Sequence, residues 1–174
     1  MSPRNLEAKF RLDNLALAEE RARKAGYERR AILHQRDTFF VVPNGKLKLR
    51  EENDPAKLIF YRRKESGPLR LSSYDIVVVA EPAATREMLS AALGVLAVVT
   101  KERTLFKRGN IRLHLDRVEG LGDFGEIEAV IASGDDPERS RAAVDELLTT
   151  LEVDSRGLID VSYFELQLNR DSKA

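Results

Sequence analysis

Charged residues recur at every second position along several segments of this chain, in predicted strands whose other positions are apolar. In residues 45–52, lysine, arginine and glutamate share one face of the strand, while Leu47 and Leu49 lie on the other. The pattern returns in residues 5–11, 110–116 and 124–131. A single alternating strand directs its apolar face to a core and its polar face to water, and needs no further explanation. Several such strands, in a domain that also contains amphipathic helices, indicate strands closed around a charged interior, which suits a polyanion and its metal.

Two carboxylates lie two residues apart near the end of the strand-rich region. Glu126 and Glu128 share one strand face, opposite Ile127 and Ala129. Carboxylate oxygens are the hard ligands that magnesium and manganese prefer, so this pair can address one ion or a pair of ions. Asp116, on the preceding strand of the hairpin, is a further candidate ligand.

The overall charge excludes a general attraction to nucleic acid or to anionic membranes. The 174 residues include 29 basic and 29 acidic side chains, so the formal net charge is zero and any anion site must be local. The absence of cysteine excludes a disulfide framework, a thiolate nucleophile and a zinc–thiolate site. No segment resembles a signal peptide or is long enough to span a bilayer, so a cytoplasmic protein is expected.

Three amphipathic helices are predicted among the strands. Asp13 and Asn14 can cap the first helix, and Gly26 is placed to end it. Pro82 opens the second helix, and Pro137 opens the third. The predicted inward side chains of the second helix are Met88, Leu89 and Leu93.

Eight extended segments, mostly joined by hairpin turns, are enough to close a small barrel without exposed sheet edges. An ordinary small barrel has an apolar interior, which would place Leu47 and Leu49 inside and the lysines in water. The helices favour the opposite arrangement, because each needs an apolar outer surface to cover. We therefore predict one α+β domain over residues 1–174: an eight-stranded, mainly antiparallel closed β-barrel with helices packed outside. Tyr163, Phe164 and Leu166 are expected to dock before a flexible tail begins at about residue 168.

Several short motifs follow one another in a fixed order. Asn5-x-Glu7-x-Lys9 comes first, residues 45–50 read Gly-x-Leu-basic-x-Arg, and Tyr61-Arg62 follows. Later motifs lie at residues 101–103, 112–124 and 126–128. In order and spacing they resemble the CYTH family, the triphosphate tunnel metalloenzymes that include class IV adenylyl cyclases, thiamine triphosphatase and inorganic tripolyphosphatases. Residues 116–124 look most like the cyclase branch.

The resemblance implies a tunnel whose basic residues grip a triphosphate and whose carboxylates hold Mg²⁺ or Mn²⁺. The implied triphosphate-binding residues are Lys9, Lys46, Lys48, Arg50, Arg62, Lys101, Arg103 and Arg112. The implied metal ligands are Glu7, Asp116, Glu126 and Glu128. Such contacts are charge-assisted and strong in a low-dielectric channel, whereas that many buried cations would be very costly without counter-charge. The resemblance also implies a homodimer, but it identifies neither the interface nor a general base.

Two side chains can modify this site. Asn5 stands where the family pattern has its first glutamate; its amide can donate to phosphate or bind metal weakly, but it contributes no charge. His114 shares the face of Arg112 and suits a hydrogen-bonded wall residue as well as a base. The aromatic residues that could line a nucleobase pocket, or belong to the core, are Phe39, Phe40, Phe60 and Tyr61.

Three functions remain open. The leading hypothesis is a metal-dependent enzyme most like a class IV adenylyl cyclase, which converts ATP to cyclic AMP and pyrophosphate. The alternative places water at the terminal phosphorus and hydrolyses tripolyphosphate, thiamine triphosphate or a nucleoside triphosphate. The third is a noncatalytic phosphate-binding module. The expected partner is a triphosphate or nucleotide, and the position of that ligand along the tunnel, which separates the first two functions, is not fixed by the sequence.

Overall fold

The strands form one antiparallel sheet in the computed structural model, which describes residues 4–52, 55–63, 72–131, 136–153 and 157–171. The strands are β1 (Arg4–Arg11), β2 (Glu28–Phe40), β3 (Lys46–Glu51), β4 (Ala56–Arg63), β5 (Ser72–Val79), β6 (Val95–Arg108), β7 (Ile111–Val118), β8 (Gly122–Ile131) and β9 (Leu158–Ile159). The helices are α1 (Leu15–Lys24), α2 (Pro82–Leu93), α3 (Pro137–Thr150) and α4 (Tyr163–Asp171). None of these described helices is long and apolar enough to cross a membrane.

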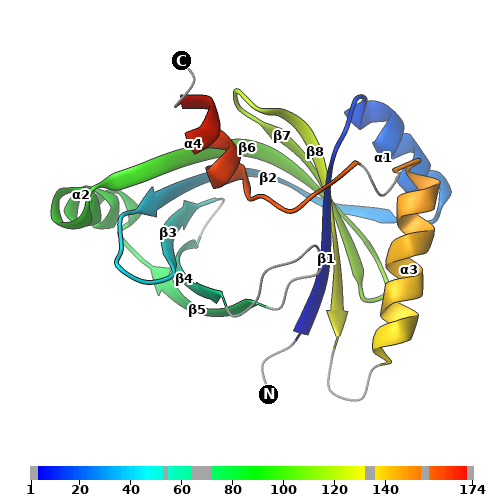
Figure 1. The fold of residues 1–174 in the computed structure, drawn as a ribbon, viewed down its shortest axis with the longest axis horizontal. Coiled ribbons are helices and arrows are strands. Elements are labelled where there is room, and N and C mark those ends of the chain that lie inside the picture. Colours follow the sequence, from blue (N-terminus) through cyan, green and yellow to red (C-terminus); the bar gives the residue numbers. More distant parts are fainter. Residues whose placement is uncertain (1–3, 53–54, 64–71, 132–135, 154–156, 172–174) are drawn as a thin grey trace.

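The strand order across the sheet is β5-β4-β3-β2-β6-β7-β8-β1-β9. The sheet curls so that its β5 end turns back toward β1 (Figure 1). Within the described residues β5 and β9 are edge strands that do not pair with each other, so the predicted closed eight-stranded barrel is corrected to an open sheet of nine strands. Hairpin signals specify which strands are neighbours, whereas closure also needs a tilt and stagger that bring both edges into hydrogen-bonding distance. The additional strand is the two-residue β9, which takes the outer edge of β1.

The two faces of the curled sheet differ in polarity. Leu49 on the outer face of β3 is fully buried, whereas its neighbour Lys48 points to the inner face and lines a cavity. The leucines therefore lie outside the curl, as the helices required, and the cations lie inside it. The main core lies outside β1, β7 and β8, where α1 and α3 cover the sheet (Figure 1). Its most deeply buried side chains are Phe10, Phe106, Leu113, Leu115 and Ile127.

The helices begin where the sequence predicts. The Asn14 side chain accepts a hydrogen bond from the Leu17 N–H at 3.0 Å and caps α1. The Asp136 side chain accepts from the Glu138 N–H at 3.0 Å and caps α3. Both caps satisfy a backbone donor that the first helical turn leaves without a partner.

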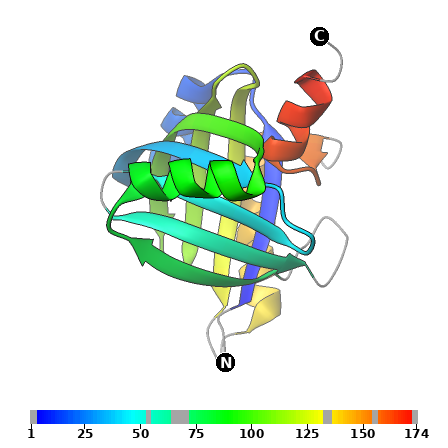
Figure 2. The ribbon, with the colours of Figure 1, turned by 90° about the vertical axis from the view of Figure 1, so that its left-hand side faces the viewer.

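Helix α2 lies across the outer face of β2 and β3 (Figure 2) and is only lightly packed. It begins at Pro82 as predicted and ends at Leu93, but Met88, which was predicted to point inward, is 65% exposed. Leu89 and Leu93 are half-buried. The helix meets the sheet along a narrow stripe, so a side chain at the margin of the predicted apolar face remains in water.

Helix α4 docks on the inner side of β6 through its first residues. Tyr163 and Phe164 are buried in a second apolar cluster with Val99, Val118 and Phe124, which confirms that they dock. The helix continues to Asp171, into the segment predicted to be a flexible tail, and the flexibility of that segment stays a prediction.

We predict that Gly45→Ala weakens the turn into β3 because Gly45 has φ +67° and an added Cβ would lie 2.3 Å from the Tyr61 carbonyl oxygen. The expected loss is about 2 to 4 kcal/mol of unfolding free energy, measured by urea denaturation. Gly109→Ala is the matched control, since Gly109 has φ +58° but nothing within 4 Å of the added Cβ. Its expected cost is about 1 kcal/mol, and equal losses for the two variants would contradict the steric argument.

Candidate functional site

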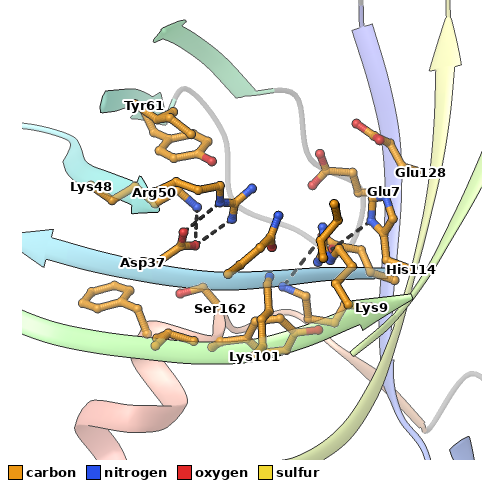
Figure 3. Close-up of a pocket in the computed structure, with 18 of the residues that line it drawn as sticks. Glu7, Lys9, Asp37, Lys48, Arg50, Tyr61, Lys101, His114, Glu128 and Ser162 are labelled. Atoms are coloured by element: carbon orange, nitrogen blue, oxygen red, sulfur yellow. Dashed lines mark hydrogen bonds and ion pairs between the residues drawn. The ribbon is translucent and has the colours of Figure 1, made fainter. Parts of the chain in front are cut away.

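The inner face of the curled sheet encloses a cavity of about 870 Å³. Among the residues that the structure describes, nine lysine and arginine side chains line it: Lys9, Arg30, Lys46, Lys48, Arg50, Lys101, Arg103, Lys107 and Arg112. Four described carboxylates line it with them: Glu7, Asp37, Glu126 and Glu128. A chain with no net charge thus gathers a local excess of cations in one hollow. Glu7, Glu128 and His114 lie at one end of this cavity, and Tyr61 and Lys48 lie toward the other (Figure 3).

Asp37 on β2 holds the two inner cations of β3. Its Oδ2 accepts from Lys48 Nζ at 2.8 Å and from Arg50 Nη2 at 2.6 Å, and its Oδ1 accepts from Arg50 Nε at 2.7 Å. Burial alone would raise the pKa of Asp37, but Lys48 and Arg50 outweigh it and hold the pKa well below its usual range. Asp37 is therefore a permanent internal counter-charge that fixes the direction of both cations.

Asp116 on β7 plays the corresponding part for Arg103 on β6. Arg103 donates to both of its oxygens at 2.7 and 2.6 Å, and the Tyr163 hydroxyl donates to Oδ2 at 2.8 Å. The Asp116 side chain is fully buried, with Lys101 Nζ 3.6 Å from Oδ2. Burial would raise the pKa of Asp116, but Arg103 and Lys101 lower it well below its usual range. Asp116, a predicted metal ligand, therefore contacts Arg103 and is not among the described residues that line the cavity. Both of its oxygens already accept hydrogen bonds.

Lys101 is buried between these groups. Burial lowers its pKa, the adjacent Arg103 lowers it further, and Asp116 opposes both, so that the pKa of Lys101 is about 7. The ammonium lies 4.9 Å from the centre of the Tyr163 ring, and Lys9 lies 4.3 Å from it. Both cations therefore lie close to the same aromatic ring, which favours their charged forms.

The remaining carboxylates come from β1 and β8. Glu7 and Glu128 are opposite each other in the strand pairing, and Arg112 Nη1 lies 3.2 Å from Glu128 Oε2. Glu126 accepts from Arg103 at 2.8 Å and lies 3.9 Å from Lys9. Burial would raise the pKa of Glu126, but Lys9, His114 and Arg103 hold it well below its usual range. Glu126 is therefore anionic, and all three glutamates line the same cavity.

These glutamates supply the oxygen ligands that Mg²⁺ and Mn²⁺ prefer. In the described parts of the chain, no three histidine, aspartate or glutamate side chains are close enough to hold an ion by themselves. Magnesium is usually bound by one or two carboxylates together with phosphate oxygens and water. The donor set of Glu7, Glu126 and Glu128 therefore fits an ion that binds together with a phosphorylated ligand.

His114 lies against this carboxylate group, with Nδ1 3.8 Å from Glu126 Oε2. The nitrogen is buried and has no hydrogen-bond partner among the residues that the structure describes. Burial and the charge of Arg103 lower the pKa of His114, and the imidazole is accordingly neutral at pH 7.

The predicted site residues gather in one place where they are described. The predicted phosphate-binding residues that line the cavity are Lys9, Lys46, Lys48, Arg50, Lys101, Arg103 and Arg112. Arg62 and Asn5 belong to β4 and β1, but their side chains lie outside the described part of the structure. Of the aromatic candidates, Phe39 and Tyr61 line the cavity, whereas Phe40 is buried on the outer face.

Sequence reasoning missed several site residues, including the lining cations Arg30 and Lys107. Asp37 follows Gln35 and precedes Phe39 at the two-residue spacing of one strand face, and all three line the cavity. That alternation was available as a signal. Tyr163 and Phe164 also line the cavity, but their helix follows the last predicted strand, so their position depends on tertiary docking.

The fold and the site together define a curled antiparallel sheet whose inner face forms a cation-rich cavity suited to an anion. The CYTH domain model matches residues 3–163, and the chain belongs to the CYTH family.

Individual relatives agree with this assignment. The chain is 25% identical to a Methanocaldococcus jannaschii protein named "Putative adenylate cyclase MJ0240", over 93% of this chain and 97% of that protein. The solved structure of PH1012 from Pyrococcus horikoshii OT3 has a TM-score of 0.82 and 25% identity, covering 93% of this chain and 98% of that one. The Hippeastrum protein HpAC1, named a "putative adenylyl cyclase" with a dominant triphosphatase activity, has a TM-score of 0.69 and 16% identity. That comparison covers 95% of this chain and 96% of the Hippeastrum chain, and it shows a shared fold alone.

We predict that Asp37→Asn destabilises the protein by about 3 to 5 kcal/mol at pH 7, because Lys48 and Arg50 lose a buried counter-charge. The pKa of Asp37 is depressed in the folded state, so its stabilising effect is present above the unfolded-state pKa of about 4 and is lost as the pH falls below that value. Urea denaturation at pH 7 and pH 3 should therefore show a smaller difference between wild type and variant at pH 3. Asp145→Asn on the exposed face of α3 is the control, and an equal loss there would contradict the assignment.

We predict that a polyanion binding in the cavity takes up a proton through Lys101. With a pKa of about 7, Lys101 is mostly neutral at pH 8, and a nearby anion favours its charged form. Calorimetry of tripolyphosphate binding in two buffers of different ionisation enthalpy should show uptake of about one more proton in wild type than in Lys101→Met at pH 8, and no difference at pH 6. Comparison with the variant removes the ligand's own proton exchange. Lys107→Met, at an exposed lining position, should behave as wild type; equal uptake in all three proteins would contradict the prediction.

Proposed function

We propose that this protein is a divalent-metal-dependent enzyme that acts on a triphosphate, in a reaction most like that of a class IV adenylyl cyclase. The observation that carries the proposal is the excess of cations in the cavity, where the described lining holds nine lysine and arginine side chains against four carboxylates. A triphosphate supplies the missing negative charge compactly, and its contacts with lysine and arginine are charge-assisted and strong. The name of the M. jannaschii relative supports the cyclase reaction.

The size of the cavity supports a ligand larger than inorganic triphosphate. Its volume of about 870 Å³ falls near the top of the range of about 300 to 1,000 Å³ that is usual for small-molecule pockets. Phe39, Tyr61 and Val99 give part of the wall an apolar surface. Aromatic rings can stack with a nucleobase, so a nucleoside triphosphate fits the lining better than its phosphates alone do.

In the proposed reaction the ribose 3′ oxygen attacks the α-phosphorus of ATP in line. The bond from that oxygen to phosphorus forms, the bond from the α-phosphorus to the bridging oxygen breaks, and pyrophosphate leaves while the 3′ hydroxyl loses its proton. Lys48, Arg50 and Arg103 neutralise charge that develops on the phosphoryl oxygens and the leaving group. Their carboxylate partners hold these cations in position before the substrate arrives, so little reorganisation is needed.

Glu7 and Glu128 are the residues proposed to hold Mg²⁺ or Mn²⁺, with Glu126 next to them. The bound ion supplies further neutralisation of phosphate charge. We assign Asp116 to a different role from the one its sequence position suggested, because its two oxygens accept hydrogen bonds from Arg103 and Tyr163. It is the anchor of Arg103.

The second candidate is hydrolysis of a triphosphate. It uses the same cations and places water, in place of the ribose oxygen, at the terminal phosphorus. The dominant triphosphatase activity in the name of the Hippeastrum protein favours including it in the test.

The test is to incubate the protein with ATP or tripolyphosphate and Mg²⁺ or Mn²⁺, and to identify the products by phosphorus NMR. Cyclic AMP with pyrophosphate would support the cyclase. Orthophosphate would reject the cyclase reaction and support hydrolysis. Binding without turnover would favour a noncatalytic module.

We predict that Lys48→Met lowers kcat/KM by about 100-fold or more, because a preorganised cation is lost where charge develops. Lys24→Met on α1 removes an exposed cation that pairs with Glu20, and it should change kcat/KM less than about twofold. Thermal melting of both variants checks that they are folded. An equally small effect of both substitutions would reject the cavity as the site of reaction.

A further inference from the structure

The start of helix α4 forms part of the cavity wall, and the helix lies almost wholly beyond the CYTH match, which ends at residue 163. Ser162, Tyr163 and Phe164 all line the cavity, and Figure 3 shows Ser162 at its wall. Phe164 stacks on Phe39 with ring centres 5.0 Å apart. The start of this helix is therefore fixed against the cations of the sheet.

Glu165 in the first turn of α4 divides its two oxygens between the helix and the cavity. Its Oε2 accepts from the Ser162 N–H at 2.7 Å and from the Ser162 hydroxyl at 2.6 Å. Ser162 and Glu165 thus form the Ser-x-x-Glu capping box of the helix. The other carboxylate oxygen of Glu165, Oε1, accepts a hydrogen bond from Lys46 Nζ at 3.1 Å. The capping box therefore directs this oxygen at a cation that lines the cavity.

Lys46 is the outermost of the three cations that β3 directs into the cavity. Lys48 and Arg50, farther along the strand, share Asp37, whose side chain is only 5% exposed. Lys46 instead pairs with Glu165, whose side chain is 29% exposed, and its ammonium lies 4.4 Å from the centre of the Phe164 ring. Each of these three cations thus pairs with a carboxylate of the protein, and Glu165 lies nearer to the surface than Asp37.

Glu165 is negatively charged at every pH at which the enzyme would work. Partial burial would raise its pKa, but the Ser162 hydrogen bonds and Lys46 lower it to about 2. A phosphate that approaches Lys46 therefore meets an anion already bound there.

We propose that Glu165 is a specificity-determining residue that occupies the outermost cation of the phosphate-binding face and disfavours ligands whose phosphate chain reaches Lys46. A ligand that ends at Lys48 and Arg50 does not meet the carboxylate. A longer chain must displace the carboxylate from Lys46 in order to bind that cation. This inference rests on the proposed function, because it concerns the same phosphate-binding cavity.

Glu165→Gln isolates the charge from the structural role of this residue, since glutamine also serves in a capping box. Calorimetry would compare pyrophosphate, tripolyphosphate and tetrapolyphosphate, each with Mg²⁺, on wild type and variant. We expect Glu165→Gln to tighten tetrapolyphosphate binding about threefold to tenfold and to leave pyrophosphate within about twofold, in line with a partly exposed ion pair. Glu87→Gln on the exposed face of α2 is the matched control and should change none of the three.

Lys46→Met gives an independent measurement of opposite sign. It leaves the Glu165 charge in place and removes the cation, so tetrapolyphosphate should bind more weakly relative to tripolyphosphate. In this background the gain from Glu165→Gln should fall below about twofold, because the cation that it would release is absent. Persistence of the full gain would overturn the proposal, as would equal tightening of all three ligands or no tightening of tetrapolyphosphate. Failure of wild type to bind tripolyphosphate would reject the proposed function and this inference with it, whereas wild-type binding with an unaltered Glu165→Gln profile would reject this inference alone.

Discussion

The pairing of buried cations with two buried aspartates is the interaction on which the rest of this structure depends. Asp37 accepts from Lys48 and Arg50, and Asp116 accepts from Arg103, in each case with both oxygens engaged. Without these counter-charges, several cations on facing strands would repel one another in a poorly solvated space. The cavity keeps its cations close together and correctly directed because the aspartates are themselves part of the fold.

A charged inner face requires the apolar core to lie elsewhere, and this requirement explains the distribution of the helices. At the β1, β7 and β8 end, α1 and α3 cover a core of fully buried aromatic and aliphatic side chains. At the other end α2 covers β2 and β3 without a fully buried side chain of its own. The cations come from both regions, since Arg103 and Lys9 lie near the well-packed end and Lys48 lies on β3. A polyanion that contacts cations from both regions would connect the well-packed part of the sheet, which α1 and α3 cover, to the lightly packed part, which α2 covers.

The sequence predicted strand faces and helix starts better than it predicted how deeply side chains are buried or whether the sheet closes. Alternation grouped the charged residues such as Lys48 on one strand face because a strand has a period of two, and the need of the helices for an apolar surface turned that face inward. Asn14 and Pro82 marked helix starts because their chemistry is local. The exposure of Met88 depends on how widely α2 meets the sheet, and the open edge depends on strand tilt; neither property is local. Glu165 illustrates the same limit. Its capping box with Ser162 is readable from spacing, but its contact with Lys46 joins residues 119 positions apart.

The carboxylates that pair with the cavity cations differ in how easily a phosphate ligand could displace them. A cation whose carboxylate stays in place suits tight binding, whereas a cation whose carboxylate can be displaced suits discrimination between ligands. Asp37 is almost fully buried and binds two cations through three short hydrogen bonds, so an arriving phosphate shares those cations without displacing it. Glu165 accepts from Lys46 at 3.1 Å and its side chain is 29% exposed, so water can solvate the carboxylate if it is released. Inner cations with a fixed partner are suited to binding any polyphosphate, whereas an outer cation with a displaceable partner responds to the length of the chain. The same residue types therefore have different roles according to the burial of the carboxylate that each cation contacts.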